Sequence, residues 1–283
     1  MHVIITGGSS GIGLALAEHY LRRGDHVTII GRAPARLADA VNHLTRQSPQ
    51  ASTRLRAERA DVCDGLRLRA VIEAACEAFG PCDTLVTCAG VVSPAAFERM
   101  EAGKFDGQVG TNLTGTANAI RSVYPSMISR RTGRIMLVSS GAALIGIPGY
   151  TAYCASKAAL IGFAEALRME AEPHGVAVSI CYPPDTETPQ LAAELLLRGE
   201  DAAAIMGAVR PWPAAKVAAR IAQGIERGVR HLHFGPSLTL LARFGPMAKP
   251  FLYWWFLRQQ RRRNGPLGNA QPDAGSADSN SAS

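Results

Sequence analysis

Alternating segments fill the first 180 residues of the chain, where short apolar runs of strand length are separated by longer amphipathic runs of helix length. We expect strands over residues 3–6, 26–31, 54–60, 84–88, 134–139 and 176–182. We expect helices over residues 12–23, 35–46, 66–79, about 104–130 and 151–172. Strands that are joined through helices lie parallel, with helices on both faces of the sheet. The alternation therefore predicts an α/β fold built on a doubly wound parallel sheet.

The remaining third of the chain has a different composition. Residues 189–230 predict two or three helices, and residues 231–263 are rich in aromatic side chains and predict an irregular segment. Residues 264–283 are rich in Asn, Gly, Asp, Ala and Ser and include no aromatic residue, which predicts a disordered tail. We therefore divide the chain into one main domain (1–230), an aromatic and basic segment (231–263) and a disordered tail (264–283).

Cysteine usage and apolar content bear on the cellular compartment. The six cysteines include no C-x-x-C pair and no cluster with histidine at zinc spacing, which favours a reducing compartment and predicts no metal site. No basic and apolar leader precedes the first strand, and no run of about 18 apolar residues occurs. We expect a cytoplasmic protein that does not span a membrane.

A glycine-rich turn, T-G-G-S-S-G-I-G, joins the first expected strand to the first expected helix. Glycines let a backbone approach a pyrophosphate closely, and the positive end of the following helix favours the negative charge of the phosphates. A turn of this kind between a strand and a helix predicts a dinucleotide-binding loop in a Rossmann-like fold. The residues of the predicted loop are Gly7, Ser9, Ser10, Gly11, Ile12 and Gly13.

The spacing of this turn, G-x-x-x-G-x-G, resembles that of the short-chain dehydrogenase/reductase family, and further motifs of the family follow in order as far as about Pro189. The resemblance implies an oxidoreductase that uses a nicotinamide cofactor. In the family, an acid after the third strand contacts the adenine edge, and Asp61-Val62 stands at that place. The alternative is that Asp61 caps the next turn.

The end of the second expected strand bears on the choice between NAD and NADP. An acid there would bond the ribose 2′-hydroxyl and select NAD, but this chain has Arg32, with Arg36 four residues later. An arginine at this place accommodates a 2′-phosphate. We therefore expect NADPH as the cofactor, with Arg32 and Arg36 at its phosphate. The alternative is two solvated surface arginines.

Tyr153 and Lys157 form the Y-x-x-x-K pattern of the family, and their spacing places both side chains on one face of a helix. The resemblance implies that Tyr153 gives a proton to a ketone oxygen and that both residues contact the cofactor. A phenol with a pKa near 10 is a poor donor at neutral pH. We expect the neighbouring ammonium, together with the positive charge of the oxidised nicotinamide, to lower the pKa of Tyr153, because both favour the phenolate.

Two further polar residues match the family's catalytic set. Its serine stands thirteen positions before the tyrosine, which selects Ser140 as the residue that polarises the substrate carbonyl. Ser139 is the alternative, one residue away on the opposite side of the strand. Asn112 matches an asparagine that holds a water linking the lysine to solvent; without the resemblance it is a polar helix residue.

Two loops would contact the nicotinamide half of the cofactor. T-C-A-G (87–90) takes the place of the family's N-N-A-G and departs from it at the first two positions, with Ala89 and Gly90 against the cofactor. Y-P-P-D-T-E-T-P (182–189) follows the last strand, where Pro183, Thr186 and Thr188 would contact the carboxamide and diphosphate. A proline-stiffened turn without specific contacts is the alternative. This string and residues 151–157 and 162–170 resemble the subgroup of 3-ketodihydrosphingosine reductases.

Positive charge gathers near the C-terminal end. The chain carries a net charge of +7, and Glu226 is the one acid between residues 202 and 263. Within this region P-F-L-Y-W-W-F-L (250–257) precedes Arg258 and three further arginines at 261–263. Aromatic residues beside arginines suit the boundary of lipid headgroups, so we expect 231–263 to contact the cytosolic face of a membrane. The alternative is packing on the core or on a second subunit.

Three functions follow from these expectations. The first is NADPH-dependent reduction of 3-ketodihydrosphingosine to dihydrosphingosine in sphingolipid biosynthesis, by a dimer or tetramer. The second is reduction of another long-chain or acyl-carrier 3-oxo substrate. In that case the basic residues between 202 and 263 would bind an acidic carrier protein. The third is a non-catalytic NADPH sensor or scaffold, against which the predicted proton donor argues. The regional charge gives no indication of nucleic-acid binding.

Overall fold

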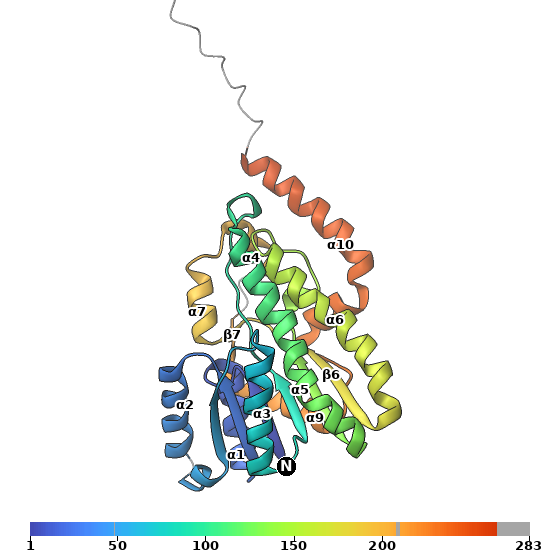
Figure 1. Cartoon of the computed structure of the whole chain (residues 1–283). Helices are drawn as coiled ribbons and strands as arrows, with labels where there is room; N and C mark the ends of the chain where they lie inside the picture. Colours follow the sequence, from blue (N-terminus) through green and yellow to red (C-terminus); the bar gives the residue numbers. More distant parts are fainter. Residues whose placement is uncertain (48, 208–209, 265–283) are drawn as a thin grey trace, which may run out of the picture. The chain divides into compact units, whose positions relative to one another are not determined.

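Seven strands form the expected parallel sheet in the computed structural model, which describes residues 1–47, 49–207 and 210–264 (Figure 1). The spatial order is β3-β2-β1-β4-β5-β6-β9, and each strand runs parallel to its neighbours. All six expected strands are present within one residue of their expected ends, which confirms the fold class. The strands are β1 (His2–Thr6), β2 (His26–Gly31), β3 (Leu55–Arg59), β4 (Thr84–Thr87), β5 (Gly133–Val138), β6 (Val176–Tyr182) and β9 (His231–His233).

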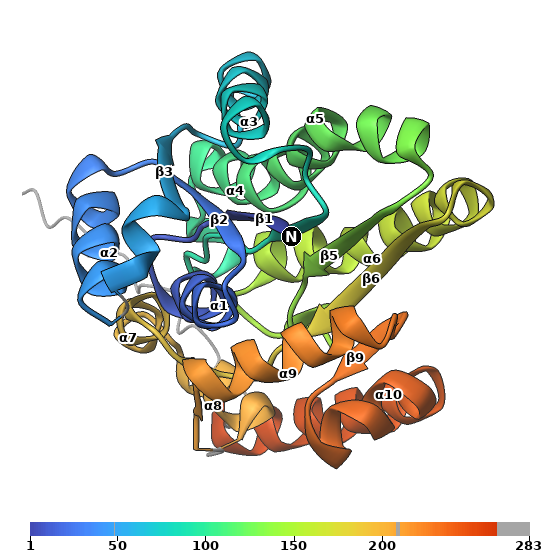
Figure 2. The same ribbon diagram turned by 90° about the horizontal axis from the view of Figure 1, so that it is seen from below.

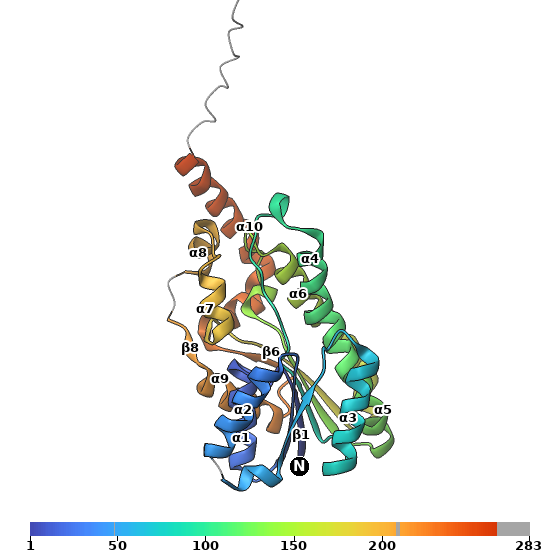
Figure 3. The ribbon, with the colours of Figure 1, turned by 60° about the vertical axis from the view of Figure 1, so that its left-hand side comes forward.

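Helices cover both faces of this sheet, as Figures 2 and 3 show. On one face α1 packs against α9, and on the other α3 packs against α5 while α6 lies along β6. Because helices lie over both faces, every side chain of β1 and β4 is buried. The helices of this part are α1 (Gly11–Arg22), α2 (Pro34–Gln47), α3 (Gly65–Phe79), α4 (Ala102–Val109), α5 (Gly115–Arg130), α6 (Thr151–Ala171), α7 (Pro189–Leu195), α8 (Glu200–Met206) and α9 (Ala214–Glu226).

The strand order reverses at β1, which pairs with β2 on one side and with β4 on the other. Connections that leave a parallel sheet in opposite directions open a crevice at the carboxyl ends of the two central strands. The loops that follow β1 and β4 therefore face each other, and this crevice is where the predicted site residues gather.

The helix expected over residues 104–130 contains an interruption. It consists of α4, a π-helical turn at Gly110–Thr114 and α5. Single π-turns within helices occur frequently at functional sites. Asn112 lies in this turn.

The expectation of an irregular segment over residues 231–263 is wrong, because the chain forms the edge strand β9 and then the helix α10 (Gly235–Asn264) there. β9 pairs with β6, where the rings of His231 and His233 stack on Tyr182 and Leu232 is buried. Leu238 and Leu241 pack on the core, so the first compact unit extends beyond the expected boundary at residue 230 to Gly245.

The second unit begins at Pro246 and contains the rest of α10, which includes Pro246 and Pro250. All but the first residue of the tail predicted at 264–283 lies outside the described residues. A search of the described helices for one long and apolar enough to cross a membrane finds none.

Candidate active site

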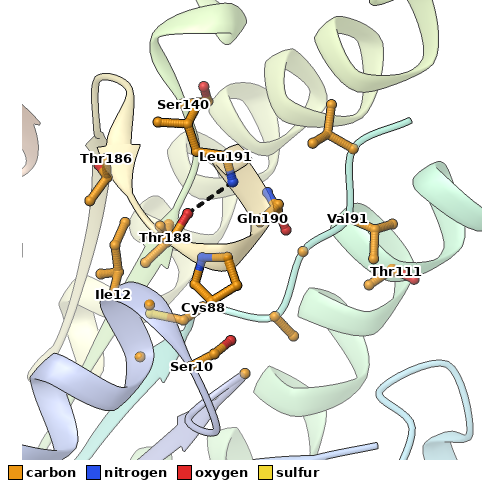
Figure 4. Close-up of a pocket in the computed structure, with 18 of the residues that line it drawn as sticks. Ser10, Ile12, Cys88, Val91, Thr111, Ser140, Thr186, Thr188, Gln190 and Leu191 are labelled. Atoms are coloured by element: carbon orange, nitrogen blue, oxygen red, sulfur yellow. Dashed lines mark hydrogen bonds between the residues drawn. The ribbon is translucent and has the colours of Figure 1, made fainter. Parts of the chain in front are cut away.

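A cavity of about 450 Å³ lies at the carboxyl edge of the sheet and is lined by the loops that follow β1, β2, β4, β5 and β6. Figure 4 shows Ile12 and Cys88 close to Thr186 and Thr188 on one side of it, with Val91 and Thr111 on the other side. Its size is that of a pocket for a small molecule or cofactor. The predicted site residues that line it are Gly7, Ser9, Ser10, Gly11, Ile12, Gly13, Arg32, Arg36, Val62, Ala89, Gly90, Ser140, Tyr153, Lys157, Pro183, Thr186 and Thr188.

The glycine turn brings backbone against backbone at one end of the cavity. Gly7 has a φ of +69°, and a Cβ atom there would lie 2.7 Å from the Ala89 nitrogen. A Cβ atom at Gly13 would lie 2.4 Å from the Gly7 carbonyl oxygen. Backbone atoms cannot yield to such contacts, so the turn requires glycine at both positions.

The N-terminus of α1 faces the same end of the cavity. Ser10 is its N-cap residue, makes no side-chain capping hydrogen bond, and is followed by a first turn without acids. A helix start with free N–H groups favours an anion through both hydrogen bonding and the helix dipole. The glycine cradle and this helix start therefore fit a pyrophosphate.

Arg32 and Arg36 lie on the adjoining wall, after β2 and in the first turn of α2. The Arg32 guanidinium lies 3.5 Å from the Asp61 carboxylate, and both side chains are roughly half exposed. Exposed ion pairs of this kind are weak, so Arg32 is free to turn to an anionic ligand.

Asp61 does not belong to the cavity lining; its other oxygen accepts a hydrogen bond from the Cys63 N–H at 2.9 Å. This contact is the turn-capping arrangement that we considered as the alternative for Asp61. Val62 does line the cavity, and its side chain packs against Gly115, where a Cβ atom would lie 2.3 Å away.

The loop after β4 passes beneath the cavity. The Ala89 N–H donates to the Thr6 hydroxyl at 3.2 Å, and a Cβ atom at Gly90 would lie 3.3 Å from both the Lys157 Nζ and the Asn112 Oδ1. Thr87, which departs from the family pattern, donates instead to the Met136 carbonyl of β5. Burial raises the pKa of the Cys88 thiol to about 12, so it stays protonated and unreactive.

Tyr153 and Lys157 lie on α6, and both line the cavity. The Lys157 Nζ donates to the Val138 carbonyl at 2.9 Å and lies 5.9 Å from the centre of the Tyr153 ring. The lysine is buried, and the loss of contact with water lowers its pKa from 10.5 to about 8.

Ser139 and Ser140 have different partners. The Ser139 hydroxyl donates to the Lys157 carbonyl at 2.9 Å, which ties the end of β5 to α6. The Ser140 hydroxyl accepts a hydrogen bond from the Ala142 N–H and lies close enough to the Tyr153 phenol to lower its pKa. Ser140, and not Ser139, is therefore the serine beside the phenol.

The pKa of Tyr153 moves in the direction opposite to our expectation. Burial raises it well above 10, and the carboxylates of Glu194 and Asp185 raise it further, against the lowering effect of the Ser140 hydrogen bond. The expectation that Lys157 lowers this pKa is wrong for this arrangement, because burial dominates and the ammonium is directed at the Val138 carbonyl. The phenol is consequently protonated at neutral pH.

Asn112 is fully buried and outside the cavity lining. Its side-chain amide accepts from the Val91 N–H at 2.8 Å and donates to the Val91 carbonyl and the Ser156 hydroxyl. These bonds join the loop after β4 to α6, so the side chain of Asn112 holds the two walls of the site together.

The loop after β6 forms the wall beside the start of α1. Thr188 is the N-cap of α7, and its hydroxyl accepts from the Leu191 N–H at 3.1 Å, as the dashed line in Figure 4 marks. The Thr186 hydroxyl donates to the Pro184 carbonyl at 2.8 Å. Thr188 thus keeps a hydrogen to donate, whereas Thr186 keeps its lone pairs to accept.

Our sequence reasoning missed four residues at this wall: Tyr150, Asp185, Glu194 and Arg198. The first three line the cavity, and Arg198 connects Asp185 with Glu194 through hydrogen bonds of 2.8 and 2.6 Å. The spacing of Glu194 and Arg198 suggests a helical ion pair, but no pattern in the sequence places this pair beside Tyr150.

The buried amine makes stability depend on pH in a defined way. The pKa of Lys157 is lower in the folded than in the unfolded protein, so the unfolded chain binds more protons between about pH 8 and pH 10.5. The free energy of unfolding therefore rises with pH in this window by about 3 kcal/mol. We expect Lys157→Met to remove this rise, as measured by urea denaturation at successive pH values. The exposed Lys104→Met should keep it, and parallel pH profiles of wild type and Lys157→Met would contradict the assignment.

Comparison with known proteins places this chain in a family. A sequence model described as short chain dehydrogenase matches residues 1–195. A 3-ketodihydrosphingosine reductase from Mus musculus is 40% identical over 194 residues, which cover 68% of this chain and 58% of that protein. A 3-ketodihydrosphingosine reductase from Dictyostelium discoideum is 31% identical over 269 residues, covering 90% of this chain and 80% of that protein. The chain thus spans less than two thirds of its mammalian relative.

Solved structures share the fold. A levodione reductase superposes with a TM-score of 0.76 at 22% identity, covering 82% of this chain and 95% of that one. An actinorhodin polyketide ketoreductase, solved with NADPH, superposes with a TM-score of 0.74 at 27% identity, covering 84% of this chain and 96% of that one. The family match extends over most of the chain, and the curated relatives exceed 30% identity over two thirds of it. The chain belongs to the short-chain dehydrogenase family.

Proposed function

We propose that this protein uses NADPH to reduce a lipidic ketone, converting 3-ketodihydrosphingosine to dihydrosphingosine. The proposal is supported by two features that occur in the same chain, its sequence similarity and the residues that line its cavity. The sequence matches several proteins named for this reaction at 31–41% identity. The same chain brings Ser140, Tyr153 and Lys157 together at one cavity.

The residues around the cavity support NADPH as the cofactor, which supplies the hydride for the carbonyl carbon when it is bound. The glycine turn and the start of α1 would hold the pyrophosphate, with Gly7, Ser9, Ser10, Gly11, Ile12 and Gly13. Arg32 and Arg36 would hold the 2′-phosphate. The remaining contacts are assigned to Asp61, which lies outside the lining beside Arg32, and to the lining residues Val62, Ala89, Gly90, Tyr153, Lys157, Pro183, Thr186 and Thr188.

Proton transfer to the ketone oxygen is assigned to Tyr153. Its phenol is protonated at neutral pH, so it has a proton to give as the oxygen gains negative charge. The Ser140 oxygen accepts from Ala142, so its own hydrogen, which acts on the Tyr153 phenol in this structure, would turn to the same ketone oxygen when the substrate binds.

The proton that Tyr153 loses must be replaced. Lys157, whose pKa of about 8 leaves it protonated at neutral pH yet able to release its proton, is the nearest source. Gly90 leaves room between Lys157 and the Asn112 side chain, where we place the water that would link the lysine to solvent.

The proposed reaction is tested by following NADPH oxidation with 3-ketodihydrosphingosine, and with an acetoacetyl thioester for comparison. We expect turnover of the sphingoid ketone and a fall of at least about 100-fold in Tyr153→Phe, because the proton donor is removed while NADPH still binds. Tyr124→Phe, on α5, should retain wild-type rates.

Three outcomes would count against this reading. Turnover of the thioester without turnover of the sphingoid would favour an acyl-carrier substrate. Normal rates in Tyr153→Phe would mean that another group donates the proton, and absence of turnover with tight NADPH binding would favour a sensor.

Cofactor choice is tested at Arg32. We expect Arg32→Ala to weaken NADPH binding by at least about tenfold, because charge-assisted hydrogen bonds to the 2′-phosphate are lost, and to leave NADH binding nearly unchanged. Fluorescence titration with each cofactor measures both constants. Arg46→Ala, at the far end of α2, serves as the control, and equal weakening of NADPH and NADH would remove Arg32 from the phosphate.

We also propose that the aromatic segment contacts an anionic lipid surface through its second-unit part. Met247 and Trp254 are 82% and 53% exposed there, and the Arg258 guanidinium lies 5.3 Å from the centre of the Trp254 ring. The sequence from residue 246 to 264 contains five basic residues and no acid. Apolar rings beside cations suit a headgroup boundary, where a lipidic ketone is also found.

The lipid contact is tested by co-sedimentation with vesicles of neutral lipid, with and without phosphatidylserine. We expect the double variant Trp254→Ser, Trp255→Ser to lose at least about tenfold in binding to anionic vesicles, because apolar area is removed from the interface. Met169→Ser, which alters an exposed apolar residue of α6, should bind normally. Unchanged vesicle binding together with a loss of oligomers would instead place the tryptophans between subunits.

A further inference from the structure

The wall of the cavity beside Tyr153 carries charged groups that the proposed reaction does not use. Glu194 accepts hydrogen bonds from the Tyr150 phenol at 2.8 Å and from the Arg198 guanidinium at 2.6 Å. Arg198 also donates to Asp185 at 2.8 Å and to the Tyr150 oxygen at 3.3 Å. These bonds connect the loop after β6 with α7 and with the start of α6, and they fix the Glu194 carboxylate in one place.

Glu194 retains binding capacity in this arrangement. Both of its hydrogen bonds are made by Oε1, and within residues 1–47, 49–207 and 210–264 no donor reaches Oε2. The side chain is 11% exposed, so water screens its charge only weakly. A carboxylate oxygen in such surroundings favours a charged donor.

The charge of the group is not balanced internally. One guanidinium, that of Arg198, is shared between the carboxylates of Asp185 and Glu194, which leaves one net negative charge on the cavity wall. Arg198 is itself only 8% exposed and makes no other ion pair among the described residues. A buried surplus charge is costly unless a partner arrives, so this wall is complementary to a cation.

This surplus charge lies close to the reacting groups. The centres of the Tyr150 and Tyr153 rings are 6.4 Å apart, and Tyr150 bonds the Glu194 carboxylate directly. The carboxylates also act on Tyr153 itself, since both Glu194 and Asp185 raise the pKa of its phenol. A cation bound by Glu194 would therefore lie next to the ketone that Tyr153 protonates.

We propose that Glu194 binds the ammonium group of an amino ketone, in which the amine stands on the carbon beside the carbonyl. The inference rests on the proposed function, because 3-ketodihydrosphingosine is such an amino ketone. It makes Glu194 a specificity-determining residue, which distinguishes sphingoid ketones from uncharged 3-oxo lipids and from acyl thioesters. Tyr150 and Arg198 are positioning residues for its carboxylate.

The test compares 3-ketodihydrosphingosine with the same ketone in which hydrogen replaces the amine. The measured quantity is the ratio of kcat/KM for the amino ketone to that for the deaminated ketone. We expect Glu194→Gln to lower this ratio at least about tenfold, mainly through KM, because a charge-assisted bond is replaced by a weaker one. Glu187→Gln, the same substitution at an exposed position outside the cavity lining, should retain the wild-type ratio.

A second measurement uses the wild-type protein, so it does not depend on the folding of a variant. Dihydrosphingosine should inhibit at least about tenfold more strongly than the same lipid without its amine. Equal inhibition, or an unchanged ratio in a folded Glu194→Gln protein, would overturn the inference while leaving the reductase activity in place. Failure of the wild type to reduce the amino ketone would overturn the proposed function and this inference together.

Discussion

The arrangement of the site depends on one close approach, that of the turn after β1 to the loop after β4. The two backbones are in contact there, since a side-chain carbon at Gly7 would lie 2.7 Å from the Ala89 nitrogen. The Thr6 hydroxyl also accepts a hydrogen bond from the Ala89 N–H. This contact closes one end of the cavity and positions the start of α1 beside it. The remaining walls are then placed by the sheet, because each follows the carboxyl end of a neighbouring strand.

Main-chain atoms hold the reacting side chains in position. Lys157 donates to the Val138 carbonyl, and the Ser139 hydroxyl donates to the Lys157 carbonyl. The Asn112 side chain bonds both the N–H and the carbonyl of Val91. Side chains anchored to a sheet and a packed helix lose little further freedom when a substrate arrives, which is the basis of preorganised catalysis. The cost is a buried amine, whose pKa falls to about 8 and whose charge opposes folding at neutral pH.

Local features of the fold and site could be predicted from the sequence, and features that depend on distant contacts could not. The six strands and the pairing of Tyr153 with Lys157 follow from short-range periodicity. β9 was missed because two of its three residues are histidines, which are accommodated by stacking on Tyr182. α10 was missed because Pro246 and Pro250 indicate helix ends. The direction of the Tyr153 pKa and the place of Glu194 depend on burial and on partners 44 residues apart.

The π-turn at Gly110–Thr114 determines which neighbouring helices α4 and α5 can pack against. Each residue of an α-helix turns the side chains by about 100°, so one extra residue rotates everything that follows by that amount. Before the turn, α4 packs against α6; after it, α5 packs against α3. The inserted residue thus rotates α5 relative to α4, so that the contact face of α4 is directed at α6 and that of α5 at α3. A change of one residue in the length of this turn would rotate the contact face of α5 by about 100° relative to that of α4.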